Sequence, residues 1–84
     1  MPSQNRDFDE AQGLLQRVVI EGERISASQI LAVAAKIAVA GDFLDLARNA
    51  LLAAARVALN NHDPGERAND LAYIAALQHE LLND

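Results

Sequence analysis

The chain has 84 residues, of which 51% are hydrophobic, 23% charged and 4% aromatic, a composition that is typical of a single globular domain and excludes a disordered chain. Its formal net charge of −5 at pH 7 argues against a general nucleic-acid or anionic-membrane binder, because neutralising phosphate groups needs a concentrated basic surface. The chain has no cysteine, which excludes disulfides and thiol chemistry.

Residues 1–6 are polar, and we expect them to form a disordered tail before a single helical domain at 7–84. The tail has no apolar core of the kind that a signal peptide needs. Charged residues and glycine interrupt the longest apolar runs further along the chain, so none of these runs is predicted to span a membrane. These features together predict a cytoplasmic protein.

The first helix is predicted to begin at Asp7, which can cap it, with Glu10 near the positive end of the helix dipole. Its apolar face contains Phe8, Ala11, Leu14, Leu15, Val18 and Val19. Gly13 lies on or beside the polar face, where we expect a tolerated surface glycine or, as the alternative, a close approach of another backbone. Residues 21–24 are predicted to form the polar turn that ends the helix.

A central hairpin of two nearly all-apolar helices is predicted at 26–60, and the rest of the fold is organised around it. Ser26 and Gln29 match a capping box, in which each side chain bonds the free backbone N–H of the other residue. This pattern predicts that the first hairpin helix begins at Ser26 and runs to about Ala40.

The turn of the hairpin is predicted at Gly41-Asp42. Gly41 suits the left-handed residue that closes a helix, and Asp42 can cap the second hairpin helix at 43–60. The residues Ala34, Gly41-Asp42-Phe43, Ala47, Ala50 and Ala53-Ala54, with Pro64 beyond them, resemble a tetratricopeptide hairpin. The resemblance covers this hairpin alone and implies two tightly packed antiparallel helices. Because such repeats need about three units, we interpret it as shared hairpin geometry and not as membership of that family.

The last helix has a clear start, with Asp63 as cap, Pro64 at the first helical position and Glu66 at the third. It is predicted to run over 64–82, with an apolar side of Leu71, Ile74, Leu77, Leu81 and Leu82. Short connections make sequential helices antiparallel neighbours. The predicted fold is therefore all-α, a four-helix antiparallel bundle built around the central hairpin.

The outer faces of the two hairpin helices have few polar residues. The solvent side of the first is predicted to contain Ser28, Gln29, Ala32, Ala35, Lys36 and Val39. One stripe of the second contains Asp45, Arg48, Asn49, Leu52, Arg56 and Asn60. In that stripe Leu52 lies between Arg48 and Arg56, and arginine beside apolar residues is typical of interface centres. We therefore expect Val39, Arg48, Leu52 and Arg56 to form an interface, with a single exposed leucine between solvated arginines as the equal alternative.

The partner on this interface is predicted to be a second copy or a different protein, because a chain of this length cannot cover two apolar helices on all sides. The exposed charges of the hairpin are mostly basic. The first helix and the turn after it carry the acidic residues Asp9, Glu10, Glu21 and Glu23. This asymmetry would suit a two-fold homodimer in which the hairpin of one copy meets the acidic residues of the other.

No residue pattern predicts catalysis, a cofactor or a metal site. His62 beside Asp63 could be a base with its orienting carboxylate, but no nucleophile accompanies the pair, which favours a loop histidine next to a helix cap. Glu66 and Asp70 are one turn apart and could bind a cation, although two solvated carboxylates are the simpler interpretation. We therefore expect a protein that is not an enzyme.

The predicted function is that of a non-enzymatic interaction protein, such as an adaptor, inhibitor or regulator, acting through helix faces. The alternative is an accessory subunit of an enzyme, in which Arg48, Arg56 and Arg67 would meet an acidic or phosphorylated ligand. A nucleic-acid-binding regulator is a third hypothesis. It is weaker because the second hairpin helix offers few polar side chains for reading base edges.

Overall fold

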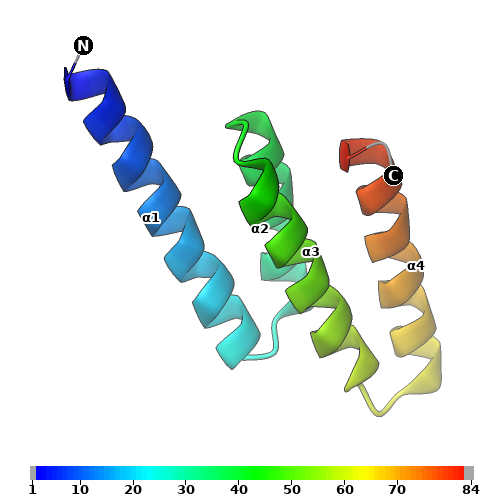
Figure 1. The fold of residues 1–84 in the computed structure, drawn as a ribbon. Helices are drawn as coiled ribbons and strands as arrows, with labels where there is room; N and C mark the ends of the chain where they lie inside the picture. The colour runs from blue at the N-terminus through cyan, green and yellow to red at the C-terminus, as the bar shows by residue number, and fades with distance from the viewer. Residues whose placement is uncertain (1, 83–84) are drawn as a thin grey trace.

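The computed structural model describes residues 2–82, with the side chains of 6–82, and this range contains four helices and no strand (Figure 1). The helices are α1 (Pro2–Arg24), α2 (Ser28–Ala40), α3 (Leu44–Leu59) and α4 (Pro64–Leu82). Sequential helices run antiparallel, joined by short turns. The predicted all-α four-helix bundle is confirmed. The separation into a tail at 1–6 and a domain at 7–84 stays a prediction.

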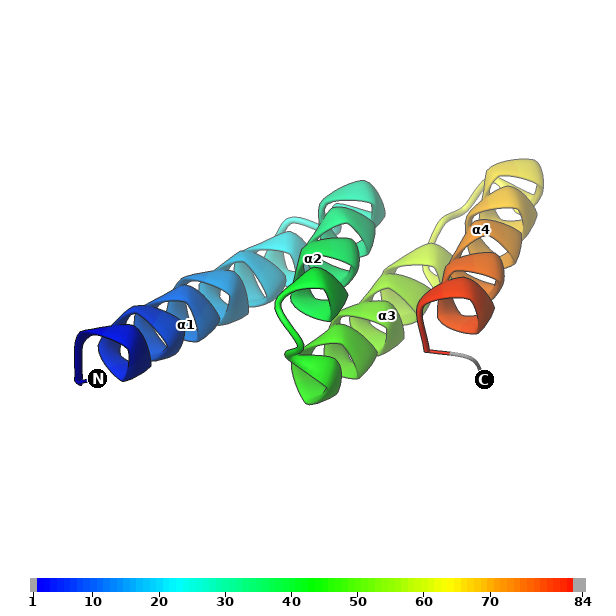
Figure 2. The ribbon, with the colours of Figure 1, turned by 90° about the horizontal axis from the view of Figure 1, so that it is seen from above.

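The bundle is open and flat. The α2–α3 pair has the most extensive packing, α1 packs against both of these helices, and α4 packs against them from the opposite side. Within 2–82, α1 and α4 do not touch each other. Figure 2 shows the helices alternating between two layers, with α1 and α3 in one and α2 and α4 in the other. The Cα atoms extend over 50 × 27 × 13 Å, so the two outer helices form separate edges.

The first helix is longer at both ends than the sequence predicted. It begins at Pro2, whose missing N–H suits the first helical position, and Asp7 lies inside it rather than at its cap. Residues 21–24, predicted as a turn, form its last helical turn. Gly22 in that turn is buried, and a Cβ there would lie 3.1 Å from Leu31 Cδ2. At Gly13, by contrast, a Cβ would have no neighbour within 4 Å, as expected for a surface glycine.

The turn between α1 and α2 is a Schellman motif, and the predicted capping box is wrong. The Ala27 N–H donates to the Gly22 carbonyl (2.8 Å), and the Ser26 N–H donates to the Glu23 carbonyl (3.1 Å). Ser26 is the left-handed residue of this motif, with φ 57°. Because Ser26 closes α1, it cannot also cap α2, and the N-cap is Ala27, whose methyl group has no capping atom.

The turn between α2 and α3 has the same geometry at Asp42. The Phe43 N–H donates to the Ala38 carbonyl (2.8 Å), and the Asp42 N–H donates to the Val39 carbonyl (3.0 Å). The left-handed residue is Asp42, at φ 64°, whereas Gly41 has φ −89°, so both predicted roles in this turn are wrong. The structure gives Gly41 a different reason to be glycine, since a Cβ there would lie 2.8 Å from the Phe43 ring.

The connection before α4 confirms the predicted helix start. Asp63 Oδ1 accepts hydrogen bonds from the N–H groups of Gly65 (2.9 Å) and Glu66 (3.2 Å). Asn61 Oδ1 in turn accepts the Asp63 N–H at 2.9 Å, which fixes the loop before the cap. The carboxylate that could have oriented His62 is therefore used to cap the helix.

Alanine dominates the core between α2 and α3. The most deeply buried small residues are Ala34, Ala35, Ala38, Ala47, Ala50, Ala53, Ala54 and Ala58, each 0% or 1% exposed. Leu31, at 0%, is the largest side chain that is fully buried among those described. Small side chains let helix axes approach closely, so this core agrees with the tight antiparallel pair that the hairpin resemblance implied.

The predicted solvent face of α2 is correct for Gln29 and Lys36, which are exposed, and wrong for two alanines. Ala32 and Ala35, expected to face solvent, are 2% and 0% exposed. The exposed side instead contains three large aliphatic residues, Ile30, Val33 and Ile37, at 42%, 52% and 54%. The reason is steric: α3 and α4 pack closely against the small alanine side chains, and this leaves the larger ones on the opposite side of α2.

Candidate functional site

The structure separates the four residues predicted to form an interface. Arg48 and Leu52 lie together on α3, in a shallow groove of about 150 Å³ beside α4. Leu52 is 58% exposed. Val39 is half-buried and packs against the core. Arg56 is exposed but bonds a residue of α1 and is absent from that groove.

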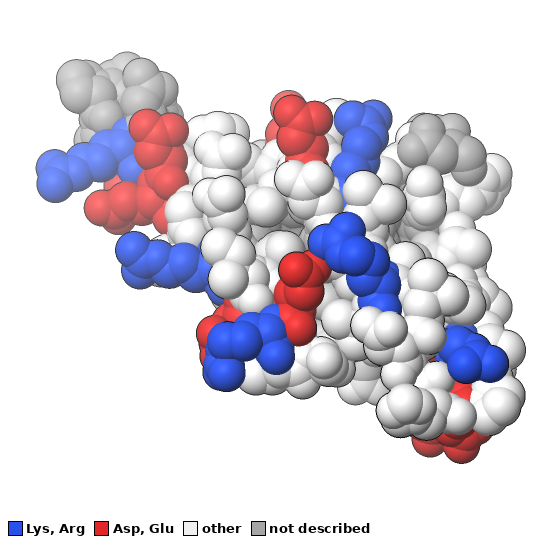
Figure 3. All heavy atoms as spheres, turned by 60° about the horizontal axis from the view of Figure 1, so that its bottom comes forward, with Lys and Arg blue, Asp and Glu red and all other residues white. Residues whose placement is uncertain are grey.

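The three arginines expected to bind a ligand if the chain is an accessory subunit each contact another residue of this chain. Arg56 Nη2 donates to Glu23 Oε2 at 2.6 Å and links α3 to α1. Arg48 Nη1 lies 3.7 Å from Asp45 Oδ1. Charges of both signs are interspersed on the face shown in Figure 3. Glu23, predicted to meet the hairpin of another copy, meets Arg56 of its own chain, which removes part of the charge asymmetry that suggested a dimer through α3.

The larger apolar surface lies between α1 and α2, which the sequence did not predict as a site. The groove there has a volume of about 360 Å³ and is lined by Leu15, Val18, Gln29, Ile30, Val33, Ala34 and Ile37. Of these described residues only Gln29 is polar. Leu14, which is 60% exposed, lies one turn before Val18 on α1 and extends the same apolar surface.

The α2 wall of this groove is a single stripe formed by Ile30, Val33 and Ile37. We call these three residues the α2 stripe. Their spacing of three and four residues places them on one face of the helix, which is the pattern that anchors an amphipathic helix in a groove. The spacing is visible in the sequence. Because almost every position of α2 is apolar, however, hydrophobicity alone does not show which side faces solvent.

Lys36 is the one charged residue in the sequence of α2, and it is not among the residues that line this groove. Its Nζ lies 5.6 Å from the centroid of the Tyr73 ring on α4. The Tyr73 side chain, first by hydrogen bonding and then by charge, raises the pKa of Lys36. The groove between α1 and α2 therefore has no charge from α2 at its centre.

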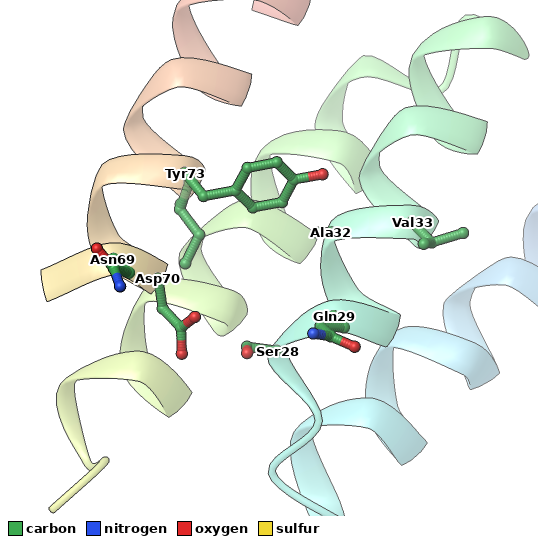
Figure 4. A pocket seen from close by; sticks show the side chains of 8 residues that line it. Ser28, Gln29, Ala32, Val33, Asn69, Asp70 and Tyr73 are labelled. Carbon is green, nitrogen blue, oxygen red and sulfur yellow. The ribbon is translucent and has the colours of Figure 1, made fainter. Parts of the chain in front are cut away.

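A second groove, of about 470 Å³, lies between α2 and α4 (Figure 4). Ser28 and Gln29 line it from α2, and Asn69, Asp70 and Tyr73 line it from α4, with the Asp70 carboxylate directed toward Ser28. The polar side chains that line this groove can donate and accept hydrogen bonds. Among the described residues no group of three or more His, Cys, Asp or Glu side chains is arranged to hold a metal ion.

Charges at the end of α1 are paired locally. Arg24 donates to both carboxylate oxygens of Glu21, one turn earlier in the same helix. This contact lowers the pKa of Glu21 and raises the pKa of Arg24. Both side chains are exposed, so the pair makes at most a small contribution to stability.

No protein-family model matches the sequence, and comparisons with curated proteins and with solved structures found no match. No helix in the described part of the chain is long and apolar enough to cross a membrane. A function for this chain has to be inferred from its own surfaces.

Proposed function

We propose that this protein is a non-enzymatic protein–protein interaction module that binds a helix in the groove between α1 and α2. The observation that carries the proposal is the exposed α2 stripe, which forms one wall of a groove whose described lining has one polar side chain. Exposed apolar surface that is contiguous and rimmed by polar residues is typical of interaction sites.

The lining of the groove has the chemistry that suits the apolar face of a helical ligand. Two antiparallel helices border it, and Leu15 and Ala34 are buried at its base. A ligand helix with apolar residues three and four positions apart would place them between Val18 on one wall and the α2 stripe on the other. Gln29 at its margin can bond a polar group of the ligand.

Binding of amphipathic helical peptides tests this function. We expect peptides with apolar residues at positions i, i+3, i+4 and i+7 to be selected from a display library. Their binding should shift the NMR methyl signals of the α2 stripe. Val33→Asp should abolish the binding, because it places a carboxylate at the centre of an apolar wall. The matched control is Leu52→Asp, since Leu52 is similarly exposed but lies on α3.

The exposed side of α3 is a second candidate surface, as the sequence predicted. Leu52 and Leu59 are each 58% exposed, two turns apart on one side of that helix, and Arg48 lies beside Leu52. The same pair of variants distinguishes the two surfaces. Peptide binding that survives Val33→Asp and is lost with Leu52→Asp would contradict the α1–α2 groove and favour α3.

The remaining functional hypotheses have less support. An accessory subunit that binds an acidic or phosphorylated ligand would need basic groups that are free to bind it, yet Arg56, although exposed, bonds Glu23, and Arg67 Nη1 donates to the Asn61 carbonyl at 3.3 Å. Heat stabilisation by a phosphorylated metabolite would favour this hypothesis. A cytoplasmic location stays a prediction.

A further inference from the structure

We propose that the occupant of the α1–α2 groove is a second copy of this chain, with α2 packed antiparallel against α2 of the partner copy. The pairing has two-fold symmetry, and its axis passes α2 near residues 33–34. This inference rests on the proposed function, because it names the partner of the same groove. Three observations carry it.

The first observation is that the α2 stripe is nearly symmetrical about its own centre. Ile30 and Ile37 lie at its two ends, with Val33 between them. In an antiparallel two-fold pair, Ile30 of one copy meets Ile37 of the other, and the two Val33 side chains meet near the axis. Such a contact is isologous, so every apolar side chain of the stripe is covered by another one.

The second observation is the distribution of charge. The chain has a formal net charge of −5, so two copies repel each other unless their acidic residues stay apart. A charge near a two-fold axis always meets its own copy. Here the stripe and its flanking residues Gln29 and Ala40 are uncharged, and Lys36 is directed toward Tyr73 on α4. The axis therefore passes through a stripe of α2 whose own side chains carry no charge.

The third observation is that the α2 stripe and the α1–α2 groove lie on the same surface of the molecule. A single foreign helix would fill the groove and leave the outer side of the α2 stripe in water. In a two-fold pair, the α2 stripe of each copy covers the α1–α2 groove of the other copy. The exposed parts of Leu14, Val18 and the α2 stripe amount to roughly 400 Å² per copy, or about 800 Å² for the pair. A specific interface buries about 1,200 Å² or more in total, so polar residues around the stripe must supply the remaining area.

Sedimentation over a concentration series tests the pairing. We expect the wild-type chain to form a dimer with a Kd on the order of micromolar, as the small interface implies. Val33→Asp should weaken it by about 100-fold, because two carboxylates would meet near the axis. Ile37→Lys is a second variant that places a charge on the stripe, and circular dichroism shows whether each variant is still helical. Leu52→Asp should leave the dimer unchanged.

Cysteine cross-linking tests the antiparallel register, and the chain contains no other cysteine to interfere. An equal mixture of the Ile30→Cys and Ile37→Cys variants should yield mainly the mixed disulfide. Each variant alone should cross-link poorly, because the two identical positions lie far from each other across the axis. Preferential cross-linking of one variant with itself would overturn the antiparallel pairing.

The outcomes separate this inference from the proposed function. A wild-type chain that remains monomeric at high micromolar concentration overturns the second copy, and selected peptides that still bind the groove would then uphold the interaction module. A dimer that resists Val33→Asp and Ile37→Lys but dissociates with Leu52→Asp overturns this pairing in favour of α3. A monomer that also binds no peptide overturns both proposals.

Discussion

The apolar side chains of α2 are divided mainly by size between its buried and exposed sides. One side carries Ala35 and Ala38, both 0% exposed, and packs against neighbouring helices. The other carries the α2 stripe, whose large aliphatic side chains are about half exposed. On transfer free energy alone, the isoleucines and valine would be buried first and the alanines left outside. Except for Leu31, which is fully buried, the observed order is the reverse.

This difference indicates that close approach of the helices decides which side of α2 is covered. Alanine buries little area by itself, but it lets the backbones of two helices come close enough for many contacts between them. The hairpin obtains a thin, dense core in this way, and the three large side chains of the α2 stripe stay exposed at the edge beside α1. That edge is the surface that we propose as the binding site, and the packing of α2 would then explain why this site is exposed.

The largest effect is expected from Leu31→Ala. Leu31 is fully buried, and it contacts the position of Gly22 at the α1–α2 junction. Truncating it should cost about 3 kcal/mol in unfolding free energy through lost burial and the cavity left behind. Ile37→Ala on the stripe is the control and should cost less than about 1 kcal/mol in the dilute monomer. Urea denaturation at low protein concentration measures both values.

The reverse change, Ala35→Leu, tests whether the side of α2 that carries Ala35 and Ala38 is closely packed. The added side chain would have to fit between closely packed helices, so we expect a loss of about 2 kcal/mol or more. Val33→Leu, a similar enlargement on the stripe, should be nearly neutral. An Ala35→Leu variant as stable as the wild type would mean that this side of α2 faces solvent, as the sequence had predicted. Thermal unfolding of the two variants decides between these results.

Local signals in the sequence predicted the helices well. Four helices were expected and four are described, and the bounds of α4 follow from Asp63 and Pro64, which act locally as cap and first helical residue. The turns were predicted less well, because Ser26 matches a helix cap in the sequence but takes a different role in the structure. The residue that could begin α2 instead closes α1 in a left-handed conformation.

The site could be predicted only in part, because it depends on which helices surround α2. The exposure of Leu52 was expected from the charged stripe on α3, and the structure agrees. The α2 stripe could not be chosen over the alanine side from periodicity, since both sides are apolar. Its three-and-four spacing was present in the sequence, but what identified it as a surface was the position of α1 and α4 on either side of the hairpin.

Two glycines of α1 should respond to alanine in opposite directions. A Cβ on Gly22 would lie 3.1 Å from Leu31 Cδ2 and 3.3 Å from Ile30 Cγ2. We expect this crowding to cost about 2 kcal/mol. It exceeds the gain of about 1 kcal/mol from replacing glycine in a helix, so Gly22→Ala should lower the unfolding free energy by about 1 kcal/mol. Gly13→Ala adds a methyl group in open space within a helix and should raise it by about 0.5–1 kcal/mol. Chemical denaturation of both variants provides the comparison. Stabilisation by both would mean that α1 and α2 are not in close contact at this end of the groove.

The smallest effect is expected at the turn that joins the two walls of the groove. Ser26 has φ 57°, a conformation that costs an ordinary residue about 1–2 kcal/mol and glycine almost nothing. Glycine loses more entropy on folding, by roughly 0.5–1 kcal/mol. Ser26→Gly should therefore raise the unfolding free energy by about 0.5 kcal/mol. Asp42→Gly, at φ 64°, should raise the unfolding free energy by less than Ser26→Gly does, because aspartate tolerates the left-handed region better than serine. Thermal unfolding measures both variants, and an equal gain in stability from Ser26→Gly and Asp42→Gly would contradict this ranking. A loss of stability in Ser26→Gly would mean that the Ser26 hydroxyl has a role in the turn.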